Sequence, residues 1–414
     1  MEDVNVDVLI IGAGPSGCVA AAYLQRQGLS IKVIEKSRFP RFVIGESLLP
    51  RCMDHFEEVG LLECLDRQGF EIKDGARFIR GTKICEFDFS KKFTDGYDWT
   101  WQVPRADFDN VLAQELLEKG VDITFGHEVT DVDFSDNGSS MTTVKSSDGN
   151  HYEINAKFVI DSSGYGRVLP RLLHLDAPSE IPAHSSIFCH VEDRNRPKGR
   201  EGTFITFDVL DKDTWFWVIP FSNGHTSVGF VGKTDYINSF KGTPEERLKK
   251  MITQSDYYAE RFKNAELLFE PKIIQNYSKS VKQLYGKGYA LTGNSAEFLD
   301  PVFSSGVTFA TESGLRAAKL IAKELKGESV NWETDYSNYI KSGVSVFASY
   351  VKEWYTGNLQ TIFFEGNDNP EIKGQICAVL AGYVWDETNP FVKNHDRLIK
   401  TVAKIIELEN KNAI

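Results

Sequence analysis

Two glycine-containing motifs in the chain have residue types that suit the binding of a dinucleotide. Near the start, Gly12-x-Gly14-x-x-Gly17 has the spacing that permits a tight turn, close backbone approach to a pyrophosphate and close helix–strand packing. Much later, the segment from Gly293 to Pro301 reads Gly-Asn-Ser-Ala-Glu-Phe-Leu-Asp-Pro and stands before a long helical pattern. A lone glycine motif is a weak signal, but this pair is typical of proteins that bind FAD.

A third motif is aromatic. Trp215-Phe-Trp217-Val-Ile-Pro220 has the pattern of a strand, so both indoles fall on one face. Core packing is one interpretation, because aromatic side chains commonly fill protein interiors. A wall between a cofactor and a substrate is the other, and the spacing does not separate the two.

The elements around the first motif support its assignment. Residues 6–11 form an apolar run interrupted only by Asp7, as expected for a strand buried on both faces of a parallel sheet, and residues 18–27 form an alanine-rich helix. The N-terminus of that helix would offer free N–H groups and a positive dipole end to phosphates, with Pro15 and Ser16 beside them. Glu35 ends the next strand, followed by Lys36. Its carboxylate would accept hydrogen bonds from a ribose and repel a 2′-phosphate, which favours FAD or NAD over NADP.

Residues further along favour flavin over nicotinamide. Arg105 stands at a helix start and suits a phosphate or ribityl contact, although a surface arginine is the commoner explanation. The segment Asp161-Ser-Ser-Gly164 ends a strand at the point where such a fold returns to the nucleotide. The amide of Asn294 stands where the ribityl chain should run, since amides bond hydroxyl groups well.

A long helix is predicted at residues 307–326, opened by Ser304-Ser305-Gly306. The free N–H groups at its start would face the flavin ring and stabilise the negative charge of reduced flavin. The same groups could hold a small anion, so Ser305 and Gly306 are also candidates for a halide site.

The predicted fold class is α/β (α+β overall), with a Rossmann-like domain that is interrupted. A strand at residues 289–292 belongs with the first sheet, so the β-rich middle of the chain is expected to be an insertion. The predicted ranges are an FAD-binding domain in 1–80, 105–180 and 282–330, a β-rich substrate domain with an antiparallel sheet in 81–104 and 181–281, and a helical C-terminal region in 331–414.

Composition narrows the class of protein. The chain has 414 residues, 41% of them hydrophobic and 26% charged, and a net charge of −12 without a long basic run, so nucleic acid is a poor candidate partner. The six cysteines are scattered without a C-x-x-C pair, which argues against a metal site or a disulfide framework. No signal peptide and no apolar run of the ~20 residues that a membrane span needs are visible. The expected location is the cytoplasm.

With these motifs in view, the chain resembles the flavin-dependent halogenases of the tryptophan-halogenase superfamily, which have the para-hydroxybenzoate-hydroxylase-like FAD fold. The resemblance rests on the glycine motif, on Gly45-Glu46-Ser47-Leu-Leu-Pro50, on the Trp-x-Trp motif and on the segment through Gly306, and it extends to about Gly327. It implies one bound FAD, an external flavin reductase, a halide ion and an aromatic substrate. Glu46, Ser47 and Asp300 join the expected cofactor contacts.

The resemblance also assigns a catalytic role to Lys73, in the segment Gly69-Phe-Glu-Ile-Lys73-Asp-Gly75. In these enzymes a lysine receives hypohalous acid and delivers the halogen to the substrate. A protonated amine can hydrogen-bond hypohalous acid, and a neutral amine can form a haloamine. Most lysines are solvated surface charges, so the assignment requires that Lys73 be buried. The catalytic candidates are therefore Lys73, Trp215 and Trp217.

One departure narrows the substrate. Free-tryptophan halogenases have an acid after Asp-Pro and before the next Ser-Thr-Gly, where this chain has Phe303. The chain therefore resembles the halogenases of phenol- or pyrrole-type substrates, which are often presented on a carrier protein. A hydroxylase or a geranylgeranyl-type reductase of the same fold is the alternative, and a flavin-binding module without catalysis is a distant third.

Overall fold

The first strand of the chain, β1 (Val4–Ile11), is the centre of a mixed sheet. In the computed structural model, which describes residues 4–179, 184–275, 277–366 and 369–412, the strands of this sheet follow the order β19-β20-β10-β1-β2-β7. β1 lies parallel to β2 (Ile31–Glu35) and to the long β10 (His151–Asp161). The remaining strands are β7 (Asp122–Phe125), β8 (Glu128–Phe134), β9 (Ser140–Lys145), β19 (Tyr285–Gly286) and β20 (Tyr289–Leu291).

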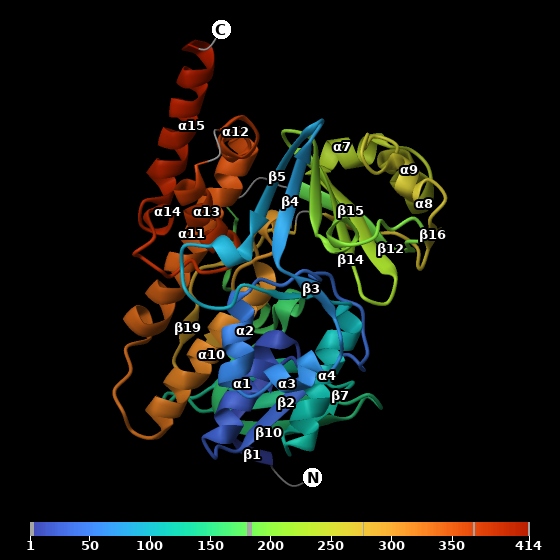
Figure 1. Cartoon of the computed structure of the whole chain (residues 1–414). Helices are drawn as coiled ribbons and strands as arrows, with labels where there is room; N and C mark the ends of the chain where they lie inside the picture. Colours follow the sequence, from blue (N-terminus) through green and yellow to red (C-terminus); the bar gives the residue numbers. More distant parts are fainter. Residues whose placement is uncertain (1–3, 180–183, 276, 367–368, 413–414) are drawn as a thin grey trace.

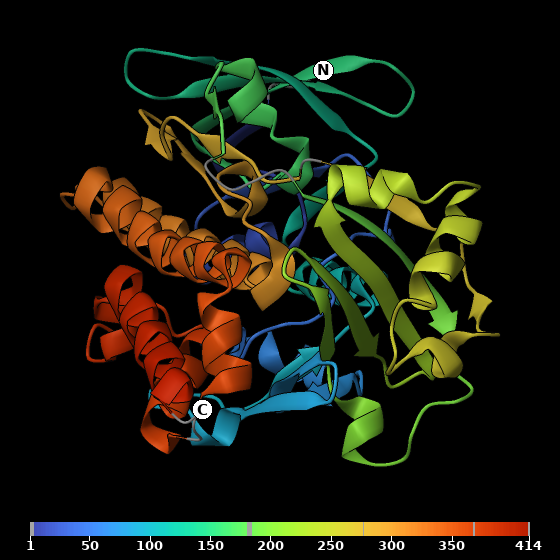
Figure 2. The ribbon, with the colours of Figure 1, turned by 90° about the horizontal axis from the view of Figure 1, so that it is seen from above.

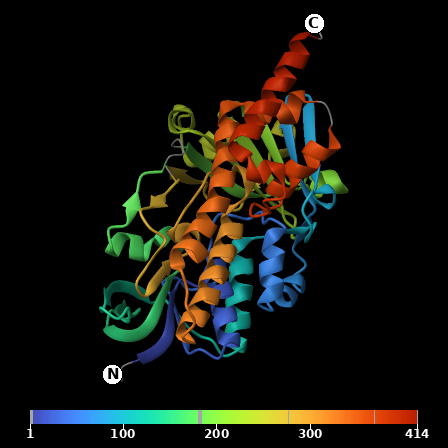
Figure 3. The same cartoon turned by 90° about the vertical axis from the view of Figure 1, so that its left-hand side faces the viewer.

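The return of the chain to this sheet late in the sequence is confirmed. β20 pairs in parallel with β10, placing Leu291 beside Asp161, and the chain then runs into α10 (Gly306–Leu325). α10 packs along α1 (Pro15–Arg26), which also contacts α4 (Arg105–Glu118). Figure 3 shows α1 and α10 side by side. Segments from three distant parts of the chain therefore meet at the ends of β1, β10 and β20.

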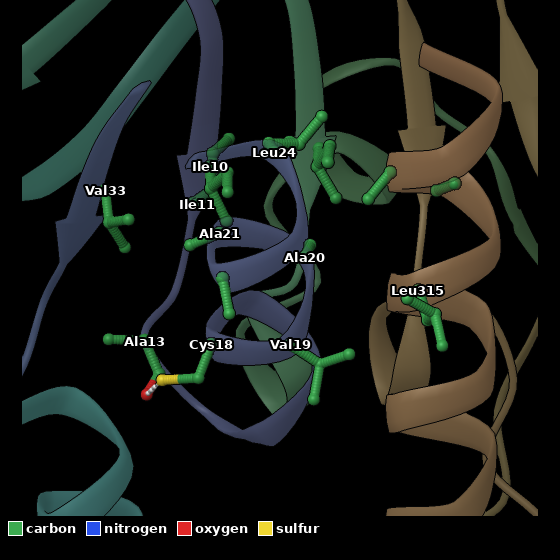
Figure 4. Close-up of a cluster of buried hydrophobic side chains, with 14 of the residues drawn as sticks. Ile10, Ile11, Ala13, Cys18, Val19, Ala20, Ala21, Leu24, Val33 and Leu315 are labelled. Carbon is green, nitrogen blue, oxygen red and sulfur yellow. Dashed lines mark hydrogen bonds between the residues drawn. The ribbon is translucent and has the colours of Figure 1, made fainter. Parts of the chain in front are cut away.

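The core beneath the glycine motif is made of small and branched apolar side chains. Ile10 and Ile11 from β1 and Val33 from β2 pack against the alanines of α1, and Leu315 of α10 closes the cluster (Figure 4). Small residues such as Ala20 and Ala21, both fully buried, let the helix approach the sheet closely. This close approach fixes the N-terminus of α1 against the ends of the strands.

A second, mostly antiparallel sheet lies beside the first, at the upper right of Figure 1, and its strands follow the order β16-β12-β15-β14-β13-β4-β5. β14 (Thr214–Pro220), which carries both tryptophans of the Trp-x-Trp motif, lies in the middle of it and is buried along its whole length. The other strands are β4 (Gly75–Arg80), β5 (Lys83–Asp88), β12 (His184–Glu192), β13 (Thr206–Asp211), β15 (His225–Lys233), β16 (Glu266–Leu267) and β17 (Lys272–Gln275).

One boundary differs from the sequence prediction. β4 falls in the range 1–80 that is predicted for the FAD-binding domain, yet it pairs with β13 of the second sheet, where Phe78 stacks on Phe207 with ring centroids 4.9 Å apart. β13 begins at Thr206, after the short helix α6 (Arg200–Thr203). The predicted fold class is confirmed.

Helices make up the end of the chain, as predicted. They lie beside α10 and the β5 edge of the second sheet, and α15 extends away from the body of the molecule (Figures 1 and 2). Their bounds are α11 (Tyr339–Thr356), α12 (Asn358–Glu365), α13 (Pro370–Leu380), α14 (Pro390–Lys393) and α15 (His395–Asn412). The remaining helices and paired strands are α2 (Arg51–Glu58), α3 (Leu62–Asp66), α5 (Val168–Leu172), α7 (Thr234–Ser239), α8 (Pro244–Ile252), α9 (Ala259–Phe262), β3 (Glu71–Lys73), β6 (Thr100–Gln102), β11 (Asp176–Ala177) and β18 (Ser280–Val281). In the part of the chain that the structure describes, no helix has the length and apolar character to cross a membrane.

Candidate active site

A cleft of about 470 Å³ runs between the two sheets and is lined from both of them. This volume lies in the range of small-molecule sites. Most of the residues that were predicted to bind the cofactor or the halide, or to form the aromatic wall, line this cleft. They are Gly12, Gly14, Pro15, Ser16, Glu35, Lys36, Glu46, Ser47, Arg105, Gly164, Trp215, Trp217, Gly293, Asn294, Ser305 and Gly306. Gly17, Lys73, Asp161 and Asp300 are not among the described residues that line it.

Gly17 and Gly14 of the first motif have different roles. A Cβ at Gly17 would lie 2.0 Å from the carbonyl oxygen of Gly12, so Gly17 is needed for packing. A Cβ at Gly14 would find Arg41 as its nearest neighbour, at 3.7 Å, so this backbone faces open space in the cleft. Gly14 caps α1 without a side-chain hydrogen bond, and the first turn has no acid. The free N–H groups and positive helix end therefore suit a pyrophosphate.

Glu35 lies at the same end of the cleft. Its two carboxylate oxygens accept the backbone N–H groups of Ala13 at 2.9 Å and Ser37 at 2.8 Å. Each oxygen retains a lone pair for a ribose hydroxyl. Lys36 also lines the cleft, and its exposed ammonium pairs with Glu128 at 2.7 Å. This end of the cleft therefore has acceptors for sugar and N–H donors for phosphate.

Arg41 is a functional candidate that the sequence analysis did not identify. It lines the cleft close to Gly14, and its Nη1 lies 2.8 Å from an oxygen of Asp109. Arg105 uses its Nε and Nη2 on the same carboxylate and its Nη1 on the carbonyls of Ile44 and Gly45. Arg105 therefore holds the Gly45 turn, whereas Arg41 lies next to Gly14. The position of Arg41 six residues after Glu35 was the signal in the sequence that could have identified it.

The turn that Arg105 supports carries orphaned polar atoms. Glu46 is buried, and its Oε1 is in hydrogen-bond contact with Nε2 of His190 from β12. Its Oε2 and the hydroxyl of the neighbouring Ser47 are buried without a hydrogen-bond partner among the described residues. Buried polar atoms of a native protein normally have partners. Because both residues line the cleft, these atoms fit a polar ligand such as a flavin ring system.

Asp161 and Arg167 arrange the wall beside the glycine motif. The buried carboxylate of Asp161 accepts the N–H groups of Ser163 at 2.9 Å and Leu169 at 2.7 Å, so it holds the turn that brings Gly164 to the cleft. Burial raises its pKa. Arg167, which the sequence analysis missed, donates to the carbonyls of Asn294 and Ser295 at 3.3 Å each. It thereby fixes the second glycine motif.

The start of α10 closes this part of the cleft. Ser304 has a left-handed backbone with φ of 58°, and Ser305 caps the helix without a side-chain hydrogen bond. A Cβ at Gly306 would have its nearest neighbour, Phe298, at 3.9 Å, so the helix start is open on the cleft side. The first turn contains no acid. The geometry suits reduced flavin or a small anion.

The opposite wall is aromatic. The indole N–H of Trp215 donates to the hydroxyl of Tyr355 at 3.2 Å, and that of Trp217 donates to Ser227 at 3.1 Å. Their ring centroids are 6.0 Å apart. Trp217 packs over Gly229, where a Cβ would lie 2.4 Å from the indole. Both indoles therefore serve as core and as cleft wall.

Lys73 lies at the end of β3 and is buried, with 3% of its surface exposed. Its Nζ donates to the carbonyl of Leu48 at 2.7 Å and stands 5.7 Å from the ring centroid of Phe89. Burial lowers its pKa to about 7. Lys73 is therefore not a solvated surface charge, and a large share of it is neutral near pH 7. Leu48 directly follows the cleft residues Glu46 and Ser47.

The donors and acceptors of the cleft fit FAD. Among the described residues, no cluster of His, Cys, Asp and Glu side chains could hold a metal ion. The cleft thus combines a nucleotide-binding end, two open helix starts and an aromatic wall.

The chain is similar in sequence to known proteins. The model of the FAD binding domain family matches residues 5–339. A 1H-pyrrole-2-carbonyl-[peptidyl-carrier protein] brominase of Pseudoalteromonas luteoviolacea is 31% identical, over 92% of this chain and 93% of its own. The corresponding chlorinase of Pseudomonas fluorescens is 29% identical, over 93% of this chain and 91% of its own.

Solved structures of flavoproteins have the same fold as this chain. The flavin-dependent brominase Bmp2 is 26% identical, with a TM-score of 0.84 over 99% of this chain and 100% of its own. A crystal structure from Cytophaga hutchinsonii, described as a flavoprotein/dehydrogenase, is 51% identical, with a TM-score of 0.96 over 98% of this chain and 100% of that one. The chain belongs to the FAD binding domain family and is a member of the flavin-dependent halogenases, with FAD as its cofactor.

Proposed function

We propose that the protein halogenates an electron-rich aromatic substrate, using reduced FAD, O₂ and a halide ion. The observation that supports this most directly is the construction of one cleft from an open nucleotide-binding helix start and the Trp215–Trp217 wall. Bound reduced FAD supplies the activation of O₂ that oxidises halide. The residues of the chain bind the reactants, separate them from water and direct the halogen.

The start of α10 is the proposed halide site. Ser305 and Gly306 border the cleft, and no acid stands in the first turn of the helix, so an anion meets N–H donors and a positive dipole end. Anomalous scattering from bromide-soaked crystals of the FAD-loaded protein should give a peak at these residues. A map without such a peak at full flavin occupancy would count against the assignment.

Lys73 is the proposed carrier of the halogen. Its buried amine, with a pKa near 7, can exist in the neutral form that attacks hypohalous acid, releasing water and forming a haloamine. The Nζ hydrogen bond to the Leu48 carbonyl holds the amine next to the Glu46–Ser47 turn. Trp215 and Trp217 then keep the substrate away from the flavin, so the halogen reaches the substrate by way of the lysine.

A pyrrole- or phenol-type substrate, presented on a carrier protein, is the proposed class. Phe303 stands where the free-tryptophan halogenases have an acid, and it is buried against Tyr350 and Trp354 and is not among the described residues that line the cleft. The two curated relatives named above act on carrier-bound pyrrole. The proposed partners are therefore a carrier protein and a separate flavin reductase. All six cysteines are free thiols, which suits the cytoplasm.

One assay tests the function. Purified protein with a flavin reductase, bromide and either an activated phenol or a carrier-bound pyrrole should give a product with the isotope pattern of bromine in mass spectrometry. A dehydrogenase is the second candidate, because the 51% identical structure carries that description. Bleaching of the flavin by NADPH alone in stopped flow, near the typical turnover of ~10 per second, would favour it. We expect slow reduction or none.

A further inference from the structure

Asp300 is a completely buried carboxylate that lies behind the wall of the cleft. Its Oδ1 accepts the backbone N–H of Val302 at 3.1 Å, and its Oδ2 accepts the hydroxyls of Tyr277 at 2.8 Å and Tyr355 at 2.9 Å. The sequence predicts a cofactor contact for this residue. The structure instead turns the carboxylate toward three donors of the protein itself, which satisfy the charge that burial would otherwise penalise.

The hydrogen bonds beyond Asp300 have a fixed direction. A tyrosine hydroxyl has one proton, and Tyr355 gives its proton to Asp300. Its oxygen is therefore the acceptor for the indole N–H of Trp215, at 3.2 Å. An indole N–H can only donate, so the chain Trp215 to Tyr355 to Asp300 has a single possible polarity. If the acid were absent, the hydroxyl of Tyr355 could turn and leave the indole without an acceptor.

Packing holds the same tyrosine in place. The imidazole of His184 stacks on the ring of Tyr355 with centroids 4.1 Å apart and planes at 16°, and its Nδ1 lies 3.8 Å from Oδ2 of Asp300. His184 is itself buried. Tyr355 therefore has a fixed ring and a fixed hydroxyl, as expected of a side chain that orients another.

The members of this network come from distant parts of the chain. Trp215 belongs to the second sheet, Asp300 to the loop before α10, and Tyr355 to α11 of the helical C-terminal region. α11 runs beside α10, on the side away from α7, α8 and α9, which lie next to the second sheet (Figures 2 and 3). The network therefore joins the three regions directly behind the cleft, since Trp215 and Tyr277 line it.

We propose that Asp300 is a positioning residue, which sets the orientation of the Trp215 indole in the cleft wall through the hydroxyl of Tyr355. The C-terminal helices are by this means part of the active site. The structural part of the inference stands on the contacts alone, whereas its consequence for catalysis rests on the proposed function. A displaced indole opens the wall, so oxidised halide leaves the cleft before it reaches the substrate.

The test is Tyr355→Phe, with Tyr350→Phe as the matched control. Both tyrosines are buried on α11, and the hydroxyl of Tyr350 has no hydrogen-bond partner in the described part of the chain. Each variant loses one hydroxyl and keeps the aromatic ring. In the FAD-loaded enzyme, one measures the halogenated substrate and the hypohalous acid that a thiol scavenger traps in solution.

For Tyr355→Phe we expect unchanged FAD content and unchanged total oxidant, with the ratio of halogenated substrate to trapped oxidant lowered by about tenfold to a hundredfold, the size of effect that small displacements in active sites produce. Tyr350→Phe should keep the wild-type ratio. A crystal structure of holo Tyr355→Phe should show Trp215 in a different orientation or in several. An unchanged ratio together with an unchanged indole would overturn the proposal.

Asp300→Ala gives a second measurement. It removes both carboxylate oxygens, so the hydroxyl of Tyr355 loses the acceptor that fixes its direction. We expect Trp215 to lose its single orientation, as in Tyr355→Phe. An ordered, wild-type indole in Asp300→Ala crystals would contradict the role of the acid. If the wild-type protein halogenates nothing, the proposed function fails, while the orientation of Trp215 in these crystals still tests the inference.

Discussion

The nucleotide end of the cleft and its aromatic end are built in different ways. At the nucleotide end, the starts of α1 and α10 present free backbone N–H groups to the cleft, and glycines leave open space beside them. At the aromatic end, side chains from several elements carry the site, and each depends on partners far away in sequence. Trp215, for example, depends on Tyr355, 140 residues later. Substitutions at the nucleotide end should therefore act by filling the space for the ligand, and substitutions at the aromatic end by removing contacts or charge.

The largest effect is expected from Lys73→Ala, which removes the buried amine next to the Glu46–Ser47 turn. FAD binding and reduction should persist, because Lys73 is not among the described residues that line the cleft. Halogenated product should fall at least about a hundredfold, the lower range for loss of a catalytic group. Lys73→Arg should fail as well, since a guanidinium stays charged and forms no haloamine. Product is measured by mass spectrometry and flavin by absorbance.

The control for this pair is Lys157→Ala, which removes an exposed lysine that pairs with Asp7. It should behave as the wild type. Wild-type halogenation by Lys73→Ala would show that the lysine has no part in the chemistry, and the assignment of the aromatic end would then rest on the two tryptophans.

The next effect tests the nucleotide end. Gly14→Val should abolish the yellow chromophore, because the added methyl groups fill the space where a pyrophosphate approaches. The apoprotein should unfold at nearly the wild-type temperature, since the nearest atom to a Cβ there is 3.7 Å away. Gly17→Ala is the contrasting variant. It should lower the yield of folded protein, because its Cβ would overlap the Gly12 carbonyl. Full flavin content in Gly14→Val would mean that the nucleotide lies elsewhere.

A third prediction concerns the charge of Lys73 and its dependence on pH. The folded-state pKa of Lys73 is about 7, below its ordinary value of 10.5. Between these values the unfolded chain binds more protons than the folded one, so the free energy of unfolding rises with pH. Lys73→Met lacks this contribution. From pH 7 to 9 the wild type should gain about 2 kcal/mol relative to Lys73→Met, because one pKa unit is worth about 1.4 kcal/mol.

Urea unfolding of both proteins at pH 7, 8 and 9 measures that difference. Parallel pH dependence of the two would show that Lys73 titrates normally and is not held in a dry environment. The halogenation rate should likewise rise with pH as the amine loses its proton near pH 7, if the neutral lysine carries the halogen.

The contrast between the two ends also explains what could be predicted from the sequence. The β1–α1–β2 unit and its glycines form a local pattern, so its fold and its role were accessible. The partner of Trp215 and the pair of Glu46 with His190 depend on contacts between residues more than a hundred positions apart, which no local pattern encodes. The hydrogen bond of the buried Lys73 goes to Leu48, in a separate segment of the chain, and no local pattern encodes it either. For Asp161, Arg105 and Asp300, the sequence indicated polar residues near the site. It could not indicate that their side chains bond mainly to the protein itself.

The smallest effect separates two cations at the nucleotide end. Arg41 lies nearest Gly14, and its side chain is 20% exposed, whereas Lys36 points its ammonium to Glu128 with 70% of the side chain exposed. If Arg41 contacts the pyrophosphate, Arg41→Ala should weaken FAD binding roughly tenfold, the scale of one charge-assisted hydrogen bond in a partly exposed site. Lys36→Ala should change it less than about twofold, because solvent already screens that charge. Titration of the apoproteins with FAD, followed by quenching of flavin fluorescence, gives both constants. Equal losses in the two variants would mean that the positive charge near the cleft acts as a general field, and that the helix start alone positions the phosphates.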